Sequence, residues 1–250
     1  MPNRPKVGEN KVTKYSQPAI CVAMSDEATP FLEGALHTGH EEAIGGASFR
    51  QITLSNGTSA LLVTSGIGLV NAATAATIAV TQFDADVLIS SGSAGGVGKQ
   101  VGVGDIVIGN RALFAFADAT AFGGYVLGQI PKMPKLYEAD VDLTRAALSA
   151  AALSTAANTT SAAHTGLVIS GDAFIWQGNY GKTVEHFPLA LAADMETAAI
   201  AQVAYKFNKP WIAIRGISDL CGPAAADDFI THVDDAAERA AAVIDLLFTD

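Results

Sequence analysis

Short, nearly uninterrupted apolar runs alternate along the chain with longer stretches whose apolar positions recur at helical spacing. Runs of the first kind occupy residues 19–24, 85–92 and 210–219, and they are typical of strands that are buried on both faces. Residues 69–83 are the clearest stretch of the second kind. Strands that alternate with helices predict an α/β domain with a largely parallel sheet and helices on both faces.

The remaining elements extend this pattern. Residues 49–64 indicate two strands joined at Asn56-Gly57, which is a strong hairpin signal. The glycine-rich stretch 90–105 is expected to be a loop, and a C-terminal helix is expected from about His232 to Phe248. Neither a linker nor a repeat is evident, so we expect a flexible leader over residues 1–17 and a single domain over residues 18–250. Further strands are predicted at residues 104–117, 165–172 and 188–194, and further helices at residues 25–36, 140–154 and after residue 194.

Carboxylates stand at the ends of three predicted strands. Glu27 follows the first strand, Glu196 follows the strand 188–194, and Asp219 ends the last strand. Ligands of open α/β sheets bind beyond the carboxyl ends of the strands. Because desolvating an unpaired charge is expensive, each of these carboxylates needs a partner or a function.

Two of these carboxylates also have a purely structural explanation. Glu27 lies in the first turn of a predicted helix, where it favours the helix dipole, and it can face a cleft at the same time. Asp219 can form a helix cap or an Asx turn. Alternatively, Ser218 orients Asp219, and Asp219 exchanges a proton with a ligand.

The helix after residue 193 begins with two carboxylates, Asp194 and Glu196. Asp194 precedes the first turn, so we expect it to be the N-cap, a role that any short polar acceptor can fill. Glu196 then lies in the first turn and, at about 3.6 residues per turn, shares a face with Ile200, Val203 and Phe207. This face should meet the sheet, which puts Glu196 at the edge of a cleft. Its partner is a backbone amide, Arg215 or a ligand.

The glycine-rich stretch 90–105 reads "SSGSAGGVGKQVGVGD". Glycines let the backbone approach a ligand closely, and free amides and hydroxyls can bind its oxygen atoms. No Gly-Lys-Ser/Thr follows as in a phosphate-binding loop, and no dinucleotide fingerprint is complete. The stretch is therefore either a tight crossover turn or part of a ligand site.

Composition narrows the class of partner. The 250 residues carry a formal net charge of −10, which argues against DNA or RNA. The sequence has no apolar run approaching the roughly 20 residues of a membrane span, and its polar start lacks the apolar core of a secretory signal. The two cysteines fit no metal or disulfide spacing, and the histidines fit no zinc pattern. We expect a cytoplasmic enzyme that acts on a small molecule, with no nucleic acid or membrane as partner.

Seven segments follow one another along the chain: "AMSDE", "SGIGLVNAA", "DVLISSGSAGG…VGDIVIG", "DATAFGGYVLGQIP", "SGDAFI", "DMETAAIA" and "IRGISD". In this order they resemble the 5′-methylthioadenosine/S-adenosylhomocysteine nucleosidases, within the nucleoside phosphorylase superfamily. The resemblance covers about residues 18–248. It implies an α/β three-layer sandwich with a mixed, largely parallel central sheet flanked by helices, a homodimer, and no metal or organic cofactor.

The resemblance also implies a role for each strand-end carboxylate. Glu27 matches the base that activates the attacking water. Glu196 matches the residue that holds the ribose hydroxyls, and Met195 lies along the sugar. Asp219 matches the acid that protonates the purine ring at N7, with Ser218 as its orienting neighbour.

Four further residues match positions around the substrate. Phe174 and Ile175 match residues that stack on the base and hydrogen-bond to it, and Ser93 matches a serine near the ribose. Phe122 matches an aromatic residue that reaches into the 5′ pocket of the partner subunit. The implied reaction is hydrolysis of the N-glycosidic bond of a 5′-substituted adenosine nucleoside, with release of adenine. The segment after Asp219 departs from the family pattern, so methylthio, homocysteinyl, deoxyadenosine and futalosine-like substituents all stay open.

Two rival functions use much the same residues. A nucleoside phosphorylase needs arginine or lysine donors for phosphate, and the segments "SGIGLVNAA" and "SSGSAGG" carry none. Hydrolysis is therefore favoured. A nucleoside-binding protein without turnover needs no base to activate water, so the intact set Glu27, Glu196 and Asp219 argues against it.

Overall fold

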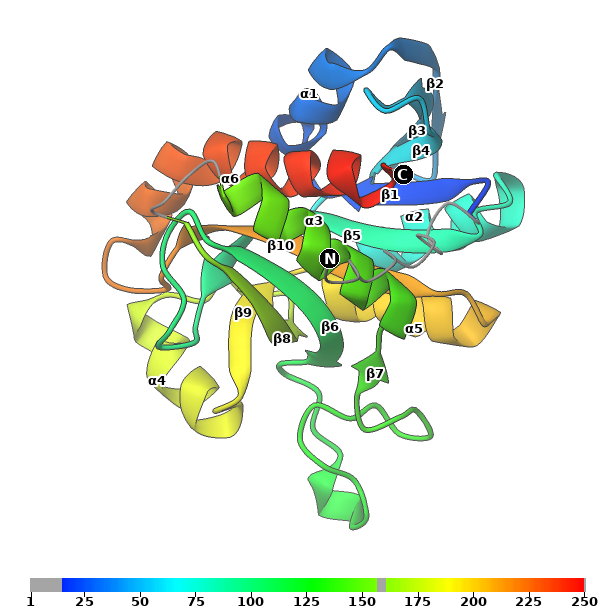
Figure 1. Ribbon diagram of the computed structural model, residues 1–250. Helices are drawn as coiled ribbons and strands as arrows, with labels where there is room; N and C mark the ends of the chain where they lie inside the picture. Colours follow the sequence, from blue (N-terminus) through cyan, green and yellow to red (C-terminus); the bar gives the residue numbers. More distant parts are fainter. Residues whose placement is uncertain (1–14, 157–160, 250) are drawn as a thin grey trace, which may run out of the picture.

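A computed structural model describes residues 15–156 and 161–249 (Figure 1). Within these residues, ten strands form one sheet, and six α-helices and one short 3-10 helix accompany it. The strands are β1 (Pro18–Val22), β2 (His37–Ile44), β3 (Ala47–Thr53), β4 (Ser59–Thr64), β5 (Val87–Gly96), β6 (Ile106–Phe114), β7 (Tyr137–Glu138), β8 (Ala163–Ser170), β9 (Ala190–Asp194) and β10 (Trp211–Asp219). The helices are α1 (Ser25–Gly34), α2 (Leu69–Gln82), η2 (Thr120–Phe122), α3 (Val141–Ala156), α4 (Gln177–His186), α5 (Thr197–Phe207) and α6 (Ala225–Leu247).

The sheet is mixed, and β5 lies at its centre. β5 pairs in parallel with β1 on one side and with β10 on the other, and its carboxyl end also pairs antiparallel with β9. From β10 the sheet continues through β6 and β8 to β9, so these five strands close on themselves. β4, β3 and β2 extend the sheet beyond β1. The predicted α/β fold, with a mixed sheet flanked by helices, is confirmed.

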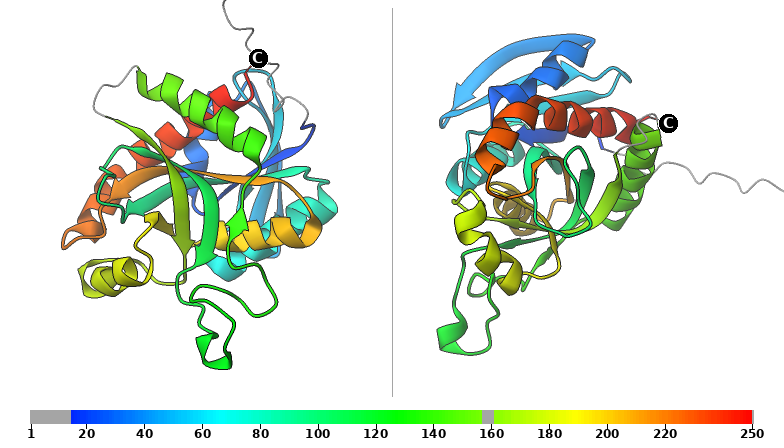
Figure 2. Two further views of the ribbon diagram at one scale, coloured as in Figure 1. Left: turned by 60° about the horizontal axis from the view of Figure 1, so that its bottom comes forward. Right: turned by 90° about the vertical axis from the view of Figure 1, so that its left-hand side faces the viewer.

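Two groups of helices cover opposite sides of the sheet. α1, α3 and α6 contribute to one apolar cluster, and α2 and α5 contribute to another. The left view of Figure 2 shows strands between the pair α3 and α6 and the pair α2 and α5. Successive residues of β1 point to opposite faces, so Ile20 joins the first cluster and Cys21 the second. None of the helices in the described ranges is long and apolar enough to span a membrane.

The predicted hairpin at Asn56-Gly57 is confirmed. β3 and β4 are antiparallel, with Thr53 opposite Ser59. Gly57 has a φ of 89°, and the Asn56 side chain accepts the amide of Thr58 at 2.8 Å. Glycine tolerates this positive φ without strain, and an asparagine side chain commonly bonds to the backbone two residues on.

Two predicted boundaries are wrong. β5 runs on to Gly96, so the first seven residues of the segment predicted as a glycine-rich loop (90–105) are strand, because β10 and β9 bond to the backbone there on either side. α6 begins at Ala225 rather than near His232. Asp227 and Asp228 fall in its first turn, where the helix dipole favours negative charge.

Four elements have no counterpart in the predictions: β2, α4, β7 and the 3-10 helix η2. Their sequences carry little apolar periodicity. β2 is an edge strand with most of its side chains exposed. α4 buries only Thr183, and β7 spans two residues. As for the predicted leader, residues 1–14 lie outside the described residues, while Ser16 and Gln17 donate to the carboxylate of Asp86.

Candidate active site

A cavity of about 400 Å³ opens at the carboxyl ends of β1, β5, β9 and β10. This is the edge of the sheet at which the polar strand ends were expected to gather. Seven of the nine predicted site residues line the cavity: Ser93, Phe174, Ile175, Met195, Glu196, Ser218 and Asp219.

Glu27 lies just behind the cavity wall. Its side chain is not part of the lining, but its bonding partners Ala23 and Ser93 are. The Ala23 amide donates to Oε2 at 2.8 Å, and the amide and hydroxyl of Ser93 donate to Oε1 at 2.7 and 2.9 Å. A Cβ atom at Gly92 would lie 2.3 Å from Oε1, so only glycine lets β5 pass this close to the carboxylate. Glu27 is thus a buried carboxylate, 2% exposed, held beside Ser93.

Asp219 ends β10 and is also buried. Its Oδ2 accepts the hydroxyl of Ser218 at 3.0 Å, and its Oδ1 accepts the amide of Cys221 at 2.8 Å. Burial raises the pKa of the Asp219 carboxyl, and the two hydrogen bonds oppose this rise because they stabilise the charged form. An aspartate with a raised pKa at a cavity wall can hold a proton that an exposed aspartate releases.

Glu196 also lines the cavity. Its Oε1 accepts the amide of Gly68 at 2.9 Å, and its Oε2 lies 3.7 Å from the Arg215 guanidinium. Burial raises the pKa of Glu196 from 4.5 to about 7, Arg215 opposes the rise, and the neighbouring charge of Asp194 adds to it. Both partners expected from the sequence, a backbone amide and Arg215, are therefore present.

The boundary between β9 and α5 corrects the prediction for this helix. β9 runs through Asp194, α5 begins at Thr197, and Glu196 is the N-cap residue instead of part of the first turn. The side chain of Asp194 still accepts the amides of Glu196 and Thr197, at 3.3 and 3.2 Å. Ile200 and Val203 are buried, as expected for the inner face, but Phe207, the last residue of α5, is 38% exposed, so its predicted place on that face is wrong.

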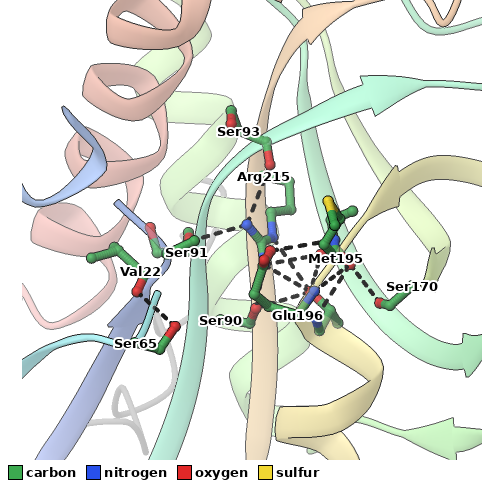
Figure 3. A network of polar contacts seen from close by, with 12 residues as sticks. Val22, Ser65, Ser90, Ser91, Ser93, Ser170, Met195, Glu196 and Arg215 are labelled. Atoms are coloured by element: carbon green, nitrogen blue, oxygen red, sulfur yellow. Dashed lines mark hydrogen bonds and ion pairs between the residues drawn. The ribbon is translucent and has the colours of Figure 1, made fainter. Parts of the chain in front are cut away.

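Asp194 does more than cap a helix. Its Oδ2 lies 2.9 Å from the guanidinium of Arg215, and Figure 3 shows the network of polar contacts around that group. Arg215, 1% exposed, also donates to Ser90 Oγ at 2.7 Å and to the carbonyl oxygens of Ser91 and Ser93. The expectation that any short polar acceptor can replace Asp194 is wrong, because a buried guanidinium requires a charged partner.

One wall of the cavity is apolar. Phe174 and Ile175 follow β8, and Phe229 and Ile230 come from the first turns of α6. The rings of Phe174 and Phe229 meet edge to face, with centroids 6.0 Å apart. No lysine or arginine lines the cavity within the described residues.

Phe122 lies apart from the cavity. It belongs to η2, in the long connection between β6 and β7 that projects from the body of the molecule in Figure 1, and it is 83% exposed. The predicted contact of Phe122 with a partner subunit stays a prediction.

The site includes groups that were not singled out from the sequence. Gly68 donates the amide that holds Glu196, and only its place before a helix in "SGIG" could have suggested this. Cys221 and Ile67 line the cavity, and no motif marks either of them. Over the described residues, no three His, Cys, Asp or Glu side chains are grouped closely enough to hold a metal ion.

Comparisons with known proteins agree with this geometry. A sequence profile described as the phosphorylase superfamily matches residues 18–249. A 5′-methylthioadenosine/S-adenosylhomocysteine nucleosidase of Listeria monocytogenes serotype 4b is 37% identical over 230 residues, which are 91% of this chain and 97% of that relative.

Two solved structures of nucleosidases with the same name superpose closely. The Neisseria meningitidis nucleosidase in complex with methylthio-immucillin-A has a TM-score of 0.85 and 33% identity, and the match covers 93% of this chain and 98% of that one. The Colwellia psychrerythraea nucleosidase in complex with adenine has a TM-score of 0.88 and 31% identity, and the match covers 94% and 95%. Since both sequence and structure match over nearly the whole length, this chain belongs to the 5′-methylthioadenosine/S-adenosylhomocysteine nucleosidase family of the phosphorylase superfamily.

Proposed function

We propose that this protein hydrolyses the N-glycosidic bond of 5′-substituted adenosine nucleosides, such as 5′-methylthioadenosine and S-adenosylhomocysteine, and releases adenine. The observation that carries the proposal is the convergence of three buried carboxylates, Glu27, Glu196 and Asp219, on one largely apolar cavity. Two relatives support the proposal, because both are 5′-methylthioadenosine/S-adenosylhomocysteine nucleosidases, at 37% and 33% sequence identity.

Asp219 is the proton donor in this proposal. Breaking the bond between C1′ and N9 leaves the bonding electron pair on the purine and builds positive charge on the ribose. A proton delivered to N7 neutralises the leaving base, and a positioned carboxyl is suited to that transfer. The raised pKa of Asp219 and its hydrogen bond from Ser218 support this role.

Glu27 is the base, and Glu196 holds the sugar. Water adds to C1′ and passes its proton to Glu27, which is fixed by Ser93 at the cavity wall. Glu196 accepts the ribose hydroxyls, and Met195 lies along the sugar. The negative charge of these carboxylates also stabilises the developing positive charge on the ribose.

The apolar wall receives the base. Phe174 stacks on adenine, Ile175 bonds to it through its backbone, and Ser93 lies near the ribose. The edge-to-face contact between Phe174 and Phe229 supports this assignment, because it presents a rigid aromatic surface to the cavity.

A phosphorylase is the less favoured alternative. Phosphate binding needs cationic donors, and the described lining of the cavity contains none. Arg215 does not line the cavity, and Asp194, Ser90 and the carbonyl groups of Ser91 and Ser93 occupy its donors. A nucleoside-binding protein without turnover is also less favoured, because binding alone does not require a buried base beside Ser93.

Assembly and location complete the proposal. We propose a homodimer in which the exposed Phe122 completes the 5′ pocket of the partner subunit, because an exposed aromatic on a projecting loop is typical of an interface. We also place the protein in the cytoplasm, in methionine salvage, with no metal or organic cofactor.

The test is an assay of adenine release in phosphate-free buffer. The substrates are methylthioadenosine, adenosylhomocysteine, 5′-deoxyadenosine, adenosine and a futalosine-type nucleoside whose base is adenine. We expect release of adenine and a free 5-substituted ribose without phosphate, and the ranking of substrates identifies the 5′ group. Turnover that requires phosphate and yields a ribose 1-phosphate overturns the proposal in favour of a phosphorylase, and binding without turnover favours the nucleoside-binding alternative.

A further inference from the structure

The segment that carries the base-binding residues has no regular secondary structure. Residues 171–176 connect β8 to α4, and Phe174 and Ile175 within them line the cavity. Asn179 fixes the end next to α4, because its side chain donates to the Phe174 carbonyl at 3.0 Å and accepts the Trp176 amide at 2.8 Å. The other half of the segment needs an anchor of its own.

Asp172 supplies that anchor by reaching across to α2. Its Oδ1 accepts the amide of Leu69, the first residue of α2, at 2.7 Å, although the two residues are 103 positions apart. The first amides of a helix have no partner within the helix, and the helix dipole favours a carboxylate beside them. No side chain at the N-cap position of α2 makes a capping bond. A residue from the base-binding segment therefore caps this helix.

The preceding amide of the same helix start binds the sugar-side carboxylate. Gly68 donates to Glu196 Oε1 at 2.9 Å, so two successive amides bind two carboxylates, that of Glu196 and that of Asp172 in the base-binding segment. Gly68 has a φ of 105°, and a Cβ atom there would lie 2.9 Å from Asp172 Oδ1. Only glycine accommodates both the backbone conformation and the close approach of Asp172.

We propose that Asp172 is a positioning residue that sets the affinity of the site for the purine base. It does not line the cavity, and it acts through the amide of Leu69 on the placement of Phe174 and Ile175. The start of α2 therefore fixes the positions of both the base-binding segment and Glu196. This inference rests on the proposed function, because it concerns adenine recognition by the same site.

The test compares Asp172→Ala, Asp172→Asn and the wild-type protein. We expect Asp172→Ala to raise KM about tenfold and to weaken adenine binding about tenfold in calorimetry, the size expected for one lost charge-assisted hydrogen bond. The kcat should change by less than about twofold, because the groups that transfer protons stay in place. Asp172→Asn keeps an oxygen acceptor for the Leu69 amide and should restore most of the affinity.

Asp140→Ala is the matched control, because Asp140 also caps a helix. Its Oδ1 accepts the Leu143 amide at 2.9 Å at the start of α3, and it does not line the cavity. If Asp172→Ala loses thermal stability as Asp140→Ala does but keeps its KM and adenine affinity, Asp172 is only a cap and the proposal is overturned.

The failure of the proposed function is a separate outcome. A wild-type protein that binds adenine but releases none from any nucleoside contradicts the proposed hydrolysis, and adenine calorimetry on the variants still decides the role of Asp172. A wild-type protein that does not bind adenine overturns both.

Discussion

The cavity has a polar part and an apolar part, which we call the floor and the rim, and the two are built in opposite ways. The floor is polar, lies at or directly behind the cavity wall and is almost wholly buried, and its charged groups bond to one another or to the backbone. The rim is apolar, comes from a loop and from the first turns of α6, and is partly exposed. The floor consists of Glu27, Asp194, Glu196, Arg215 and Asp219, and the rim consists of Phe174, Phe229 and Ile230.

The difference separates chemistry from recognition. Buried charges are costly unless they are paired, so each floor group depends on its neighbours and tolerates little change. Apolar rim residues contribute area and shape, and their effects are smaller and more nearly independent. We therefore expect floor substitutions to abolish turnover or stability and rim substitutions to change affinity.

The largest effect is expected at Asp219. Asp219→Asn removes the proposed proton donor of the leaving base while keeping the size of the side chain, so kcat should fall by about 10²–10⁴-fold. Steady-state adenine release measures this, and adenine calorimetry shows whether the site is intact. Turnover within a few-fold of wild type would show that protonation of the base does not come from the floor.

The next largest effect is expected at the buried ion pair between Arg215 and Asp194, which can be compared with an exposed ion pair of the same N–O distance. Arg215–Asp194 and Arg145–Asp142 each measure 2.9 Å, but Arg215 is 1% exposed and the Arg145 side chain is 71% exposed. Arg215→Met leaves Asp194 buried without its partner and should cost about 3–5 kcal/mol of unfolding free energy. Arg145→Met should cost less than about 1 kcal/mol. Urea unfolding compares the two, and equal losses would mean that burial does not distinguish the floor.

The pH dependence of the unfolding free energy should reveal the raised pKa of Glu196. Its pKa rises from 4.5 to about 7 on folding, so between these values the folded protein binds more protons than the unfolded chain. Stability contributed by this group is therefore present below pH 4.5 and is lost as pH rises to about 7. Glu196→Gln should gain stability relative to wild type between pH 5 and pH 8.

Urea unfolding at both pH values measures this change, with Glu42→Gln on the exposed edge strand β2 as the control. A Glu196→Gln variant whose stability relative to wild type is the same at pH 5 and pH 8 contradicts the raised pKa.

The smallest effect is expected at the rim. Phe229→Ala removes the edge-to-face contact with Phe174, a contact worth about 0.5–1.5 kcal/mol, so KM should rise by about two- to tenfold with kcat nearly unchanged. Phe207→Ala, on α5 and 38% exposed, is the matched control and should leave both constants unchanged. A large loss of kcat in Phe229→Ala would erase the distinction between rim and floor.

The sequence predicted the floor better than the rim. The carboxylates after apolar strand runs predicted that Glu27, Glu196 and Asp219 lie near one edge of the sheet, because strand ends meet there. Glu196 and Asp219 line the cavity, and Glu27 lies directly behind its wall, bonded to Ser93. The pairing of Asp194 with Arg215 was not predicted, since 21 positions separate them and no local pattern links them. The contact between Phe174 and Phe229 was also beyond local patterns, because it depends on where α6 begins. A carboxylate that follows an apolar strand can be recognised from the local sequence, whereas its bonding partners depend on tertiary packing.

Glu27→Gln is the decisive variant for the proposal that a buried base behind the cavity wall activates water. This variant keeps the shape of the side chain but cannot accept a proton from water. We predict that adenine release falls at least about a hundredfold while the affinity for adenine stays close to that of wild type. Glu33→Gln, an exposed substitution in the same helix α1, should behave as wild type. Adenine release by Glu27→Gln at a near wild-type rate would contradict the mechanism.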